Sequence, residues 1–325
     1  MIRTVRTAAA VLLAPLFLLE AGFAQAQQWP QRAVRILVPF AAGGNTDTIA
    51  RVTAERLSQV FNQQFVVENR TGAGGAIAAE AVARAAPDGH TLFVCPSSQM
   101  SVVPLMQKVS YDPRGDYTPI SIIGSNPLIL GVAASLPVKS FAELLAYIRA
   151  RPGKVPYASG GTGSLTHLVM VELTRRANLQ MDHINYKGGA PAMVDLLGGQ
   201  VPMYFGNLSD LLPHAKSDKL RLLANSGEKR SAKLPDVPTV AESGFPGFRV
   251  TTWNGLFAPA KTPQPVIDRL AQEVAKLARD PAIISRLDQI GVDAIGSTHA
   301  EIVDALRADM RFYEDLVRFA GIKLD

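Results

Sequence analysis

The stretch AVRILVPFAAGGNTDTIARVTAERLSQVF, residues 33–61, contains the pattern on which the fold depends. Residues 33–40 are nearly all apolar, as is typical of a strand that is buried on both faces. A small Gly-rich turn follows, after which Ile49, Val52 and Leu57 recur at the spacing of an amphipathic helix. A strand, a tight turn and a helix in this order predict a βαβ unit, and therefore a mostly parallel sheet covered by helices.

The same alternation of strands and helices continues along the 325 residues of the chain. Residues 117–134 look like two strands around a turn at residues 125–127, which read Ser-Asn-Pro. A helix is predicted over 140–153, with Ser140 as its N-cap and Glu143 completing a capping box. The sequence shows no short-period repeat and no low-complexity linker, so a repeat architecture is not expected.

The chain is longer than a typical single domain, so we expect two α/β domains that face each other across a cleft. The first part of domain 1 is expected at 27–125, and domain 2 at 126–250. Residues 251–325 are expected to return to domain 1, with C-terminal helices that pack on it.

The N-terminus has the pattern of a secretory signal peptide, which we place at residues 1–26. Arg3 and Arg6 precede an apolar run over 8–19, and residues 24–26 form an Ala-Gln-Ala cleavage site. The run is too short for a membrane span. We therefore expect an exported protein, located in the periplasm of a Gram-negative bacterium.

Composition and charge narrow the class of protein. The chain is 47% hydrophobic and 19% charged, as expected of a globular core. Its net charge of +5 is scattered, and no basic stripe with interleaved aromatic residues is present, so nucleic-acid binding is not expected. A mild positive balance suits an anionic small-molecule ligand. The single cysteine, Cys95, excludes an intramolecular disulfide, and the dispersed histidines predict no metal site and no cofactor.

Three turns share the layout of strand, Gly-rich turn and helix, at 41–47, 72–76 and 160–164. A helix N-terminus carries unpaired N–H groups and a partial positive charge, and glycine lets a ligand approach the backbone closely. Such turns can bind an anion. Their spacing fits neither the dinucleotide-binding nor the P-loop motif. The glycines could also serve only as tight βα connections, and the residues alone leave both interpretations open.

Individual side chains carry the same ambiguity. Asp47 could orient a ligand or a water molecule, or it could be an N-cap of the following helix. Thr162 and Ser164 could donate to a carboxylate, or they could cap the helix that follows them. His167 could be a packed histidine or a ligand contact, and Trp253 could belong to the core or to a ligand-binding wall.

An enzymatic interpretation would combine Ser164, His167 and Asp195. The chain has no G-x-S-x-G nucleophile elbow, and the i, i+3 spacing of Ser164 and His167 is an ordinary packing relation along a helix. No catalytic residue and no enzyme is therefore expected, and a periplasmic hydrolase that uses Ser164 remains the less favoured alternative.

Taken in order, several stretches resemble one family, the periplasmic substrate-binding proteins of tripartite tricarboxylate transporters, also called Bug receptors. They include WPQRAVRILVPFAAGGNTDTIAR (29–51), YASGGTGSLTHL (157–168), INYKGGAPAMVDLLGGQVPMYFGN (184–207) and WNGLFAPAKTPQPVIDRL (253–270). The resemblance covers essentially the whole chain after the signal peptide. It implies a two-domain fold like that of type II periplasmic binding proteins, with the ligand cleft between the domains. It also implies a monomer that captures a small organic carboxylate and delivers it to membrane permease subunits, and a role as a periplasmic sensor is the alternative.

The resemblance also implies which residues contact the ligand. In the family, two facing loops hold a ligand carboxylate through backbone groups and bridging waters. Carried over, one wall consists of Phe40, Ala42, Gly43, Gly44 and Asp47, and the other of Thr162, Gly163, Ser164 and His167.

Two departures from the family pattern concern specificity. Where relatives often carry Asp after a strand Phe, this chain has Gly206, followed by Asn207. Without an acid at position 206, an amino-acid ligand is not favoured. The segment after the third predicted strand, residues 96–106, lacks the Asn-Pro that is often found in the family and has Val102 and Val103 instead. Ser97, Ser98 and Gln99 are expected at the distal end of the ligand, and a more apolar pocket would suit an aromatic or a longer aliphatic acid.

Overall fold

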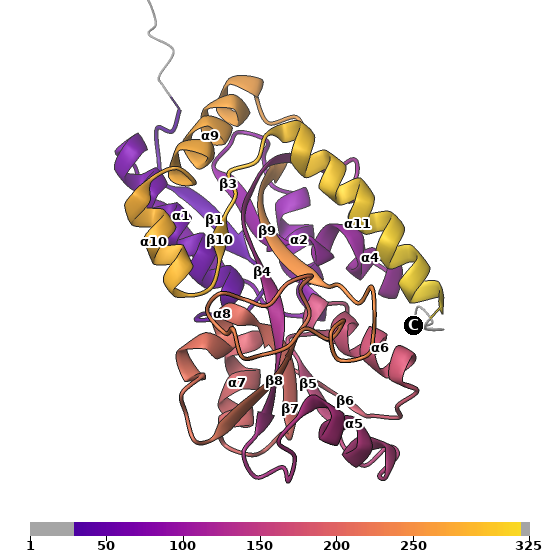
Figure 1. The fold of residues 1–325 in the computed structure, drawn as a ribbon. Helices are drawn as coiled ribbons and strands as arrows, with labels where there is room; N and C mark the ends of the chain where they lie inside the picture. The colour runs from indigo at the N-terminus through magenta and orange to yellow at the C-terminus, as the bar shows by residue number, and fades with distance from the viewer. Residues whose placement is uncertain (1–28, 320–325) are drawn as a thin grey trace, which may run out of the picture.

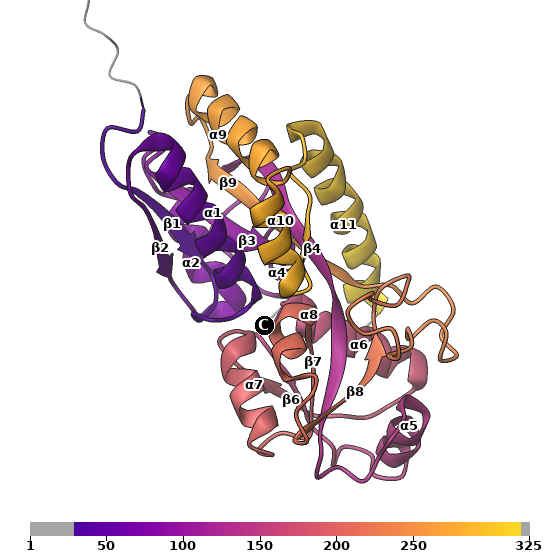
Figure 2. The same ribbon diagram turned by 60° about the vertical axis from the view of Figure 1, so that its left-hand side comes forward.

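The structure, a computed structural model, describes residues 29–319, so the predicted signal peptide lies outside the described residues. The chain forms two α/β lobes that are joined by a continuous ten-stranded sheet, as Figures 1 and 2 show from two sides. The first lobe is built on strands in the order β2-β1-β3-β9-β4. The second lobe is built on β4-β7-β5-β6, with β8 also paired to β4.

In the first lobe, β1 pairs in parallel with β2 and β3, while β9 runs antiparallel between β3 and β4. The predicted βαβ beginning is therefore present. No strand was predicted over the segment that forms β9. The strands are β1 (Val34–Val38), β2 (Phe65–Asn69), β3 (Thr91–Pro96), β4 (Tyr117–Ala133), β9 (Thr251–Pro259) and the short β10 (Asp293–Ala294).

Helices cover both faces of this sheet, and α9 contacts both α1 and β4. The helix α1 begins at Asn45, four residues before Ile49, the first apolar residue of the predicted helical pattern. The helices are α1 (Asn45–Phe61), the 3₁₀ turn η1 (Ala73–Gly75), α2 (Ala76–Ala83), α3 (Ser98–Ser101), α4 (Val103–Met106), α9 (Gln264–Leu277), α10 (Pro281–Gln289) and α11 (His299–Phe319).

The second lobe repeats the arrangement on a smaller scale, with β5 parallel to β6 and β7. Its strands are β5 (Tyr157–Ser159), β6 (His183–Asn185), β7 (Met203–Asn207) and β8 (Leu220–Asn225). Its helices are α5 (Phe141–Arg149), α6 (Leu165–Ala177), α7 (Gly189–Leu197), α8 (Leu208–Leu211) and the 3₁₀ turn η2 (Leu212–His214).

The prediction of two strands over 117–134 is wrong, because β4 is one strand of 17 residues. It runs the length of both lobes in Figures 1 and 2. Pro127 is the last residue that pairs with β9, and Leu128 is the first that pairs with β7. A proline cannot donate to a strand ladder. It is tolerated here because it lies where the strand changes partners, and the same junction joins the two lobes.

Separate hydrophobic clusters form the cores of the two lobes. In the first lobe, Ile36 and Leu256 from the sheet pack with Leu57 from α1. In the second lobe, the cluster extends to Tyr313, Leu316 and Val317 at the end of α11. Fully burying such a side chain contributes roughly 1.5–3 kcal/mol. The helix α11 therefore packs on β4, α3 and α4 of the first lobe and also contacts the core of the second.

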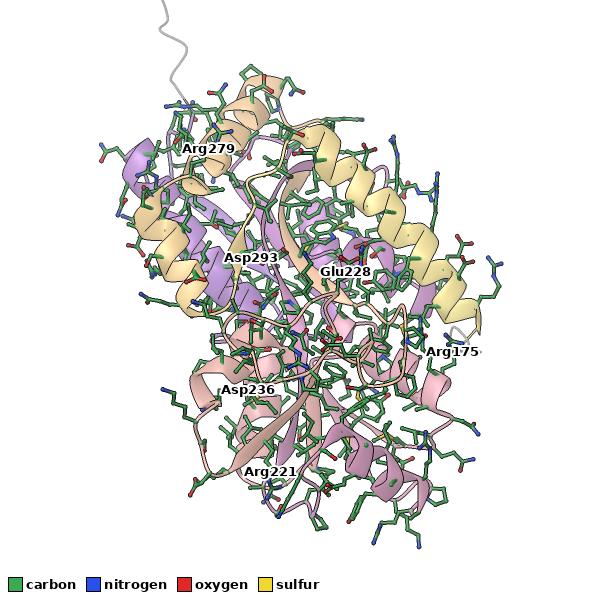
Figure 3. The ribbon with its side chains drawn as sticks, in the orientation of Figure 1. Arg175, Arg221, Glu228, Asp236, Arg279 and Asp293 are labelled. Carbon is green, nitrogen blue, oxygen red and sulfur yellow. The ribbon has the colours of Figure 1, made fainter. Side chains whose placement is uncertain are left out.

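Local hydrogen bonds explain where the elements of the second lobe begin and end. Ser140 is the N-cap of α5, as predicted, and its Oγ accepts a hydrogen bond from the Glu143 N–H. The Glu143 carboxylate accepts from the Lys139 N–H, one residue before the N-cap. At the far end of β4, the Arg221 guanidinium, labelled in Figure 3, donates to the carbonyl groups of three residues of the turn. These are Ala134, Leu136 and Val138.

Candidate ligand-binding site

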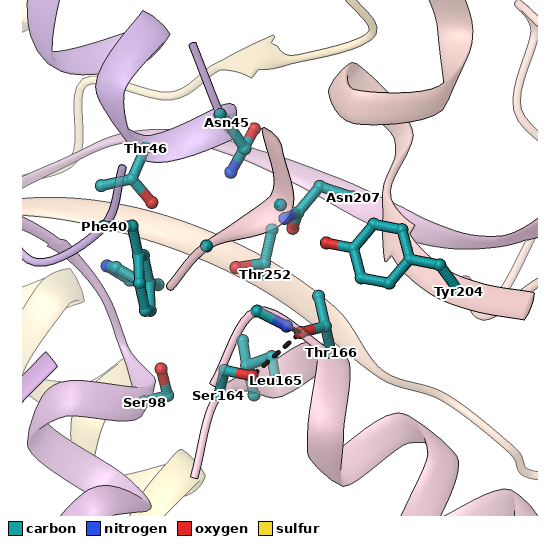
Figure 4. Close-up of a pocket in the computed structure, with 15 residues that line it drawn as sticks. Phe40, Asn45, Thr46, Ser98, Ser164, Leu165, Thr166, Tyr204, Asn207 and Thr252 are labelled. Carbon is teal, nitrogen blue, oxygen red and sulfur yellow. Dashed lines mark hydrogen bonds between the residues drawn. The ribbon is translucent and has the colours of Figure 1, made fainter. Parts of the chain in front are cut away.

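A small cavity lies between the lobes, and both lobes contribute to its lining (Figure 4). Its volume is about 30 Å³. One water molecule needs roughly 10–15 Å³ of such space, so the cavity has room for about two waters. A larger ligand would require the lobes to separate before it could enter. The lining residues are Phe40, Gly44, Asn45, Thr46, Pro96, Ser98, Gly160, Ser164, Leu165, Thr166, Gly188, Gly189, Tyr204, Asn207 and Thr252.

Three helix N-termini converge on the cavity. The first turn of α1 lies on one side, and the first turns of α6 and α7 lie on the other. Each contributes N–H groups without intrahelical partners and a partial positive charge. None of the fifteen lining residues has a charged side chain. The cavity therefore offers backbone dipoles, hydroxyl groups and amides to a ligand.

In the first lobe, the turn before α1 is held by the Asp47 carboxylate. Asp47 accepts hydrogen bonds from the Gly43 N–H at 2.9 Å, from the Arg51 guanidinium at 2.8 and 3.0 Å, and from the Asn69 amide at 2.8 Å. Burial raises the pKa of Asp47, but Arg51, Gly43 and Asn69 together more than offset it, so the net pKa is lowered. The carboxylate braces the turn from behind.

The alternative role of Asp47 as a helix N-cap is wrong. Gly44 is the N-cap, and Asp47 is the third residue of α1. Asp47 is almost fully buried, but it is not among the residues that line the cavity. The predicted direct contact between Asp47 and a ligand stays a prediction.

In the second lobe, Ser164 is the N-cap of α6, which confirms one of its two proposed roles. Its Oγ accepts a hydrogen bond from the His167 backbone N–H and bonds to Thr166 Oγ1 at 2.9 Å. Thr166 Oγ1 in turn accepts from the Gly160 N–H at 2.8 Å. The dashed line in Figure 4 marks the contact between Ser164 and Thr166 beside the cavity. Because Ser164 also lines the cavity, capping and ligand contact are compatible.

Behind this loop lies a stack of three rings, formed by His167, His183 and Tyr157. The two imidazole centroids are 4.1 Å apart, and the Tyr157 ring is 5.2 Å from His183. His167 Nδ1 accepts a hydrogen bond from the Gly163 N–H, so that nitrogen carries no proton. Burial lowers the pKa of His167 to about 3 and that of His183 to about 4. The geometry is that of a packed, neutral histidine that supports the loop.

Trp253 belongs to a hydrophobic core cluster, and its indole Nε1 donates to Asp309 Oδ2 at 3.0 Å. Its neighbour Thr252 lines the cavity instead. On the distal side, Ser98 reaches the cavity lining, whereas Gln99 Nε2 donates to the Gly74 carbonyl.

The cavity lining includes five of the thirteen predicted site residues: Phe40, Gly44, Ser98, Ser164 and Asn207. The other eight lie outside the lining: Ala42, Gly43, Asp47, Ser97, Thr162, Gly163, His167 and Gly206. For all thirteen, contact with a ligand stays a prediction.

Several lining residues were not predicted. Gly188 is the N-cap of α7 and Gly189 is its first residue, and they repeat the layout of strand, Gly-rich turn and helix, so the sequence did contain a signal for them. Tyr204 and Thr252 lie within strands, where no local pattern distinguishes a cavity residue from a core residue.

One buried carboxylate beside the cavity was also missed. Asp210 in α8 accepts hydrogen bonds from the Asn45 N–H at 3.0 Å, the Tyr204 hydroxyl at 3.2 Å and the Asn207 amide at 3.1 Å. Burial raises the pKa of Asp210, although these donors oppose the shift. The bond to Asn45 crosses from the second lobe to the first.

The three residues considered as a hydrolytic triad make other contacts. The His167 imidazole faces Gly163 and His183, and Ser164 Oγ bonds to Thr166 and to the His167 backbone. Asp195 accepts from the Tyr186 hydroxyl at 2.6 Å. This geometry does not direct an imidazole at an activated serine.

Two α/β lobes on one continuous sheet, with a polar cavity between them, are the architecture of a two-domain solute-binding protein. The family described as the tripartite tricarboxylate transporter family receptor matches residues 49–312, and the chain belongs to this family. The family expected from the sequence is therefore confirmed.

Similar proteins share nearly the whole chain. Protein BugT of Bordetella pertussis is 35% identical over 314 residues, which are 95% of this chain and 96% of that protein. The structure of R. palustris Rpa4515 with adipate has a TM-score of 0.89 at 34% identity and covers 91% of this chain and 100% of that one. MatC from Rhodopseudomonas palustris with bound malate has a TM-score of 0.86 at 31% identity and covers 89% and 100%. The family is described as a receptor family, and two of these neighbours hold a carboxylate, which supports the expectation of a binding protein.

Proposed function

We propose that this chain is a periplasmic solute-binding protein that captures a small organic carboxylate between its lobes and delivers it to a tripartite tricarboxylate-type transporter. The main support is the cavity at which three helix N-termini meet without any charged side chain in the lining. Backbone N–H groups and helix dipoles favour an anion at such a position. The neighbours that hold adipate and malate support a carboxylate as that anion.

Capture would require the lobes to open and close. In the described conformation they are in contact, since the Ala41 N–H of the first lobe donates to the Lys187 carbonyl of the second at 2.9 Å. The Asn45 amide oxygen accepts from Ser209 at 2.7 Å and from Asn126 at 3.1 Å. A ligand that touches both walls binds only the closed arrangement, so it shifts the population toward closure.

A matched pair of α6 variants tests the site. Thr166 lines the cavity, whereas Thr174 lies on the same helix and donates to the Val171 carbonyl. We expect calorimetry with a carboxylate ligand to show weaker binding for Thr166→Val and unchanged binding for Thr174→Val. Ligands would first be found by thermal shift, since a ligand at 100 times its Kd stabilises by roughly 2.7 kcal/mol. Silence across aliphatic and aromatic acids, with a folded protein, would contradict the proposal.

The proposed cellular role includes membrane permease subunits as partners and the periplasm as the location. Part of the support is the family itself, which consists of transporter receptors. Among residues 29–319, no helix is long and apolar enough to cross a membrane. We further propose that the protein acts as a monomer and that the domain boundaries lie near residues 125 and 250, where β4 continues into the second lobe and where the chain returns to the first lobe before β9. Loss of acid uptake on deletion of the permease genes would support transport, and unchanged uptake with altered gene regulation would favour the sensor alternative.

A further inference from the structure

We propose that Asp210 makes this site selective for monocarboxylates over dicarboxylates. The inference rests on the proposed function, because it names the charge class of the ligand that the same cavity would take. Its starting point is a carboxylate of the chain itself, placed immediately behind the cavity wall.

The position of Asp210 is defined by its three hydrogen-bond partners, Asn45, Tyr204 and Asn207. All three line the cavity, and they come from both lobes. A fourth lining residue, Gly189, is equally near: a Cβ atom placed on it would lie 2.4 Å from Asp210 Oδ2. Asp210 is 9% exposed, so little water screens its charge.

Asp210 already uses part of the anion-binding capacity of the site. Its Oδ1 accepts from the N–H of Asn45, which is the first residue of α1. One of the three convergent helix N-termini is thus paired with a carboxylate of the protein. The N-terminus of α7 begins at Gly189, which also lies beside Asp210, so the N-terminus of α6 is the one that remains for a ligand carboxylate. This arrangement suits one ligand carboxylate better than two.

A second ligand carboxylate would also be repelled by the negative charge of the Asp210 carboxylate. No Lys, Arg or His side chain is among the fifteen lining residues, so the lining supplies no cation to compensate for it. Like charges at close range in a poorly hydrated site are destabilising. The end of the ligand that faces Asp210 should therefore be neutral or positively charged.

The packing around β7 leaves no room for an acidic side chain at position 206. A Cβ atom on Gly206 would lie 2.0 Å from Cε1 of Tyr204, so with this tyrosine rotamer no side chain fits at position 206. The same tyrosine donates its hydroxyl hydrogen to Asp210. An acid is thus present beside the site although position 206 lacks one. The absence of an acid at position 206 therefore does not argue against a ligand that carries an amine.

The test compares acids of matched length by isothermal titration calorimetry on the full chain. The probes are hexanoate, 6-aminohexanoate and adipate, with benzoate and terephthalate as an aromatic pair. We expect each monocarboxylate that binds to bind at least tenfold tighter than its dicarboxylate partner. Asp210→Asn should reduce that ratio to less than about threefold, mainly by increasing the affinity for the dicarboxylate.

Two further variants make the result specific. Asp195→Asn is the matched control, because Asp195 also accepts from a tyrosine hydroxyl in the second lobe but does not line the cavity. It should leave the ratio unchanged. If thermal melting shows that Asp210→Asn is unfolded, Asp210→Ser removes the charge in a smaller side chain and takes its place.

The outcomes separate the two proposals. Equal or tighter binding of the dicarboxylates by the wild-type chain would overturn the role of Asp210 while supporting the proposed function. An unchanged ratio in a folded Asp210 variant would also overturn it. Absence of binding by all five acids would count against the proposed function itself.

Discussion

The two walls of the cavity are built from the same local motif but are held in place by different chemistry. In the first lobe, the turn before α1 is braced by the charged network of Asp47, Arg51 and Asn69. In the second lobe, the loop before α6 is braced by the neutral stack of His167 and His183. Both groups of side chains hold a Gly-rich turn from outside the cavity. None of the fifteen residues that line the cavity has a charged side chain. A backbone anion site can thus be supported by either ionic or uncharged groups.

The comparison predicts that acid will weaken the second wall first. The histidines have a lower pKa in the folded chain, about 3 and about 4, than the usual 6.5. The unfolded chain therefore takes up protons first, and the stability contributed by the neutral rings is complete above pH 6.5 and is lost as pH falls toward 4. One pKa unit corresponds to about 1.4 kcal/mol, so we expect each of the two histidines to lose about 3 kcal/mol of its contribution to the free energy of unfolding between pH 7 and 4.

Urea denaturation across this pH range checks the prediction. His183→Asn should flatten the dependence relative to wild type. Burial raises the pKa of Asp309 to about 6, and this group acts in the opposite direction, with stability falling as pH rises from 4 to 6. The informative quantity is therefore the difference between wild type and variant at each pH, and an identical slope would contradict the assignment to the stack.

Removing the Asp47 carboxylate should destabilise the first wall, which is the turn before α1. In Asp47→Ala, the Gly43 N–H, the Asn69 amide and the Arg51 guanidinium all lose their acceptor. Leaving such groups unsatisfied costs roughly 1–3 kcal/mol, and we expect a loss of about 2 kcal/mol at pH 7. Calorimetric melting would measure it. Weaker ligand binding by a variant of unchanged stability would instead indicate a direct ligand contact.

Closure itself can be blocked at a glycine between the walls. A Cβ atom on Gly74 of the first lobe would lie 2.1 Å from the Thr162 carbonyl oxygen of the second. Gly74→Ala should hold the lobes apart and weaken ligand binding about tenfold, which is about 1.4 kcal/mol. Gly153→Ala is the control, because Gly153 also has positive φ but has no atom within 4 Å of its Cβ position. X-ray scattering with ligand should show a larger radius of gyration for the Gly74 variant only.

The smallest expected effect shows whether Ser164 only caps its helix or also binds the ligand. Ser140 and Ser164 both cap helices of the second lobe, but only Ser164 lines the cavity. Replacing either residue by Ala should cost about 1 kcal/mol of stability. Only Ser164→Ala should also raise the ligand Kd. Equal Kd values for the two variants would mean that the Ser164 hydroxyl serves the helix alone.

Much of the fold could be predicted because its signals are local. The apolar run of β1, the periodic helix α1 and the Ser140 cap each depend on residues within a few turns of one another. The continuity of β4 could not be predicted, because Ser125-Asn126-Pro127 is a turn signal by local rules. The strand stays extended there only because β9 and β7 pair with it on either side of the junction.

By itself, the sequence determined the alternation of strands and helices, the Gly-rich turns that open the binding helices, and the membership in a family of transporter receptors. Only the tertiary structure decided which groups face the cavity. Asp210 bonds to the N–H of Asn45, 165 residues earlier in the chain, and His167 turns away to stack on His183. Periodicity reports the conformation of a short segment, whereas the first contact depends on how the two lobes are set against each other and the second on how α6 lies against β6 within the second lobe.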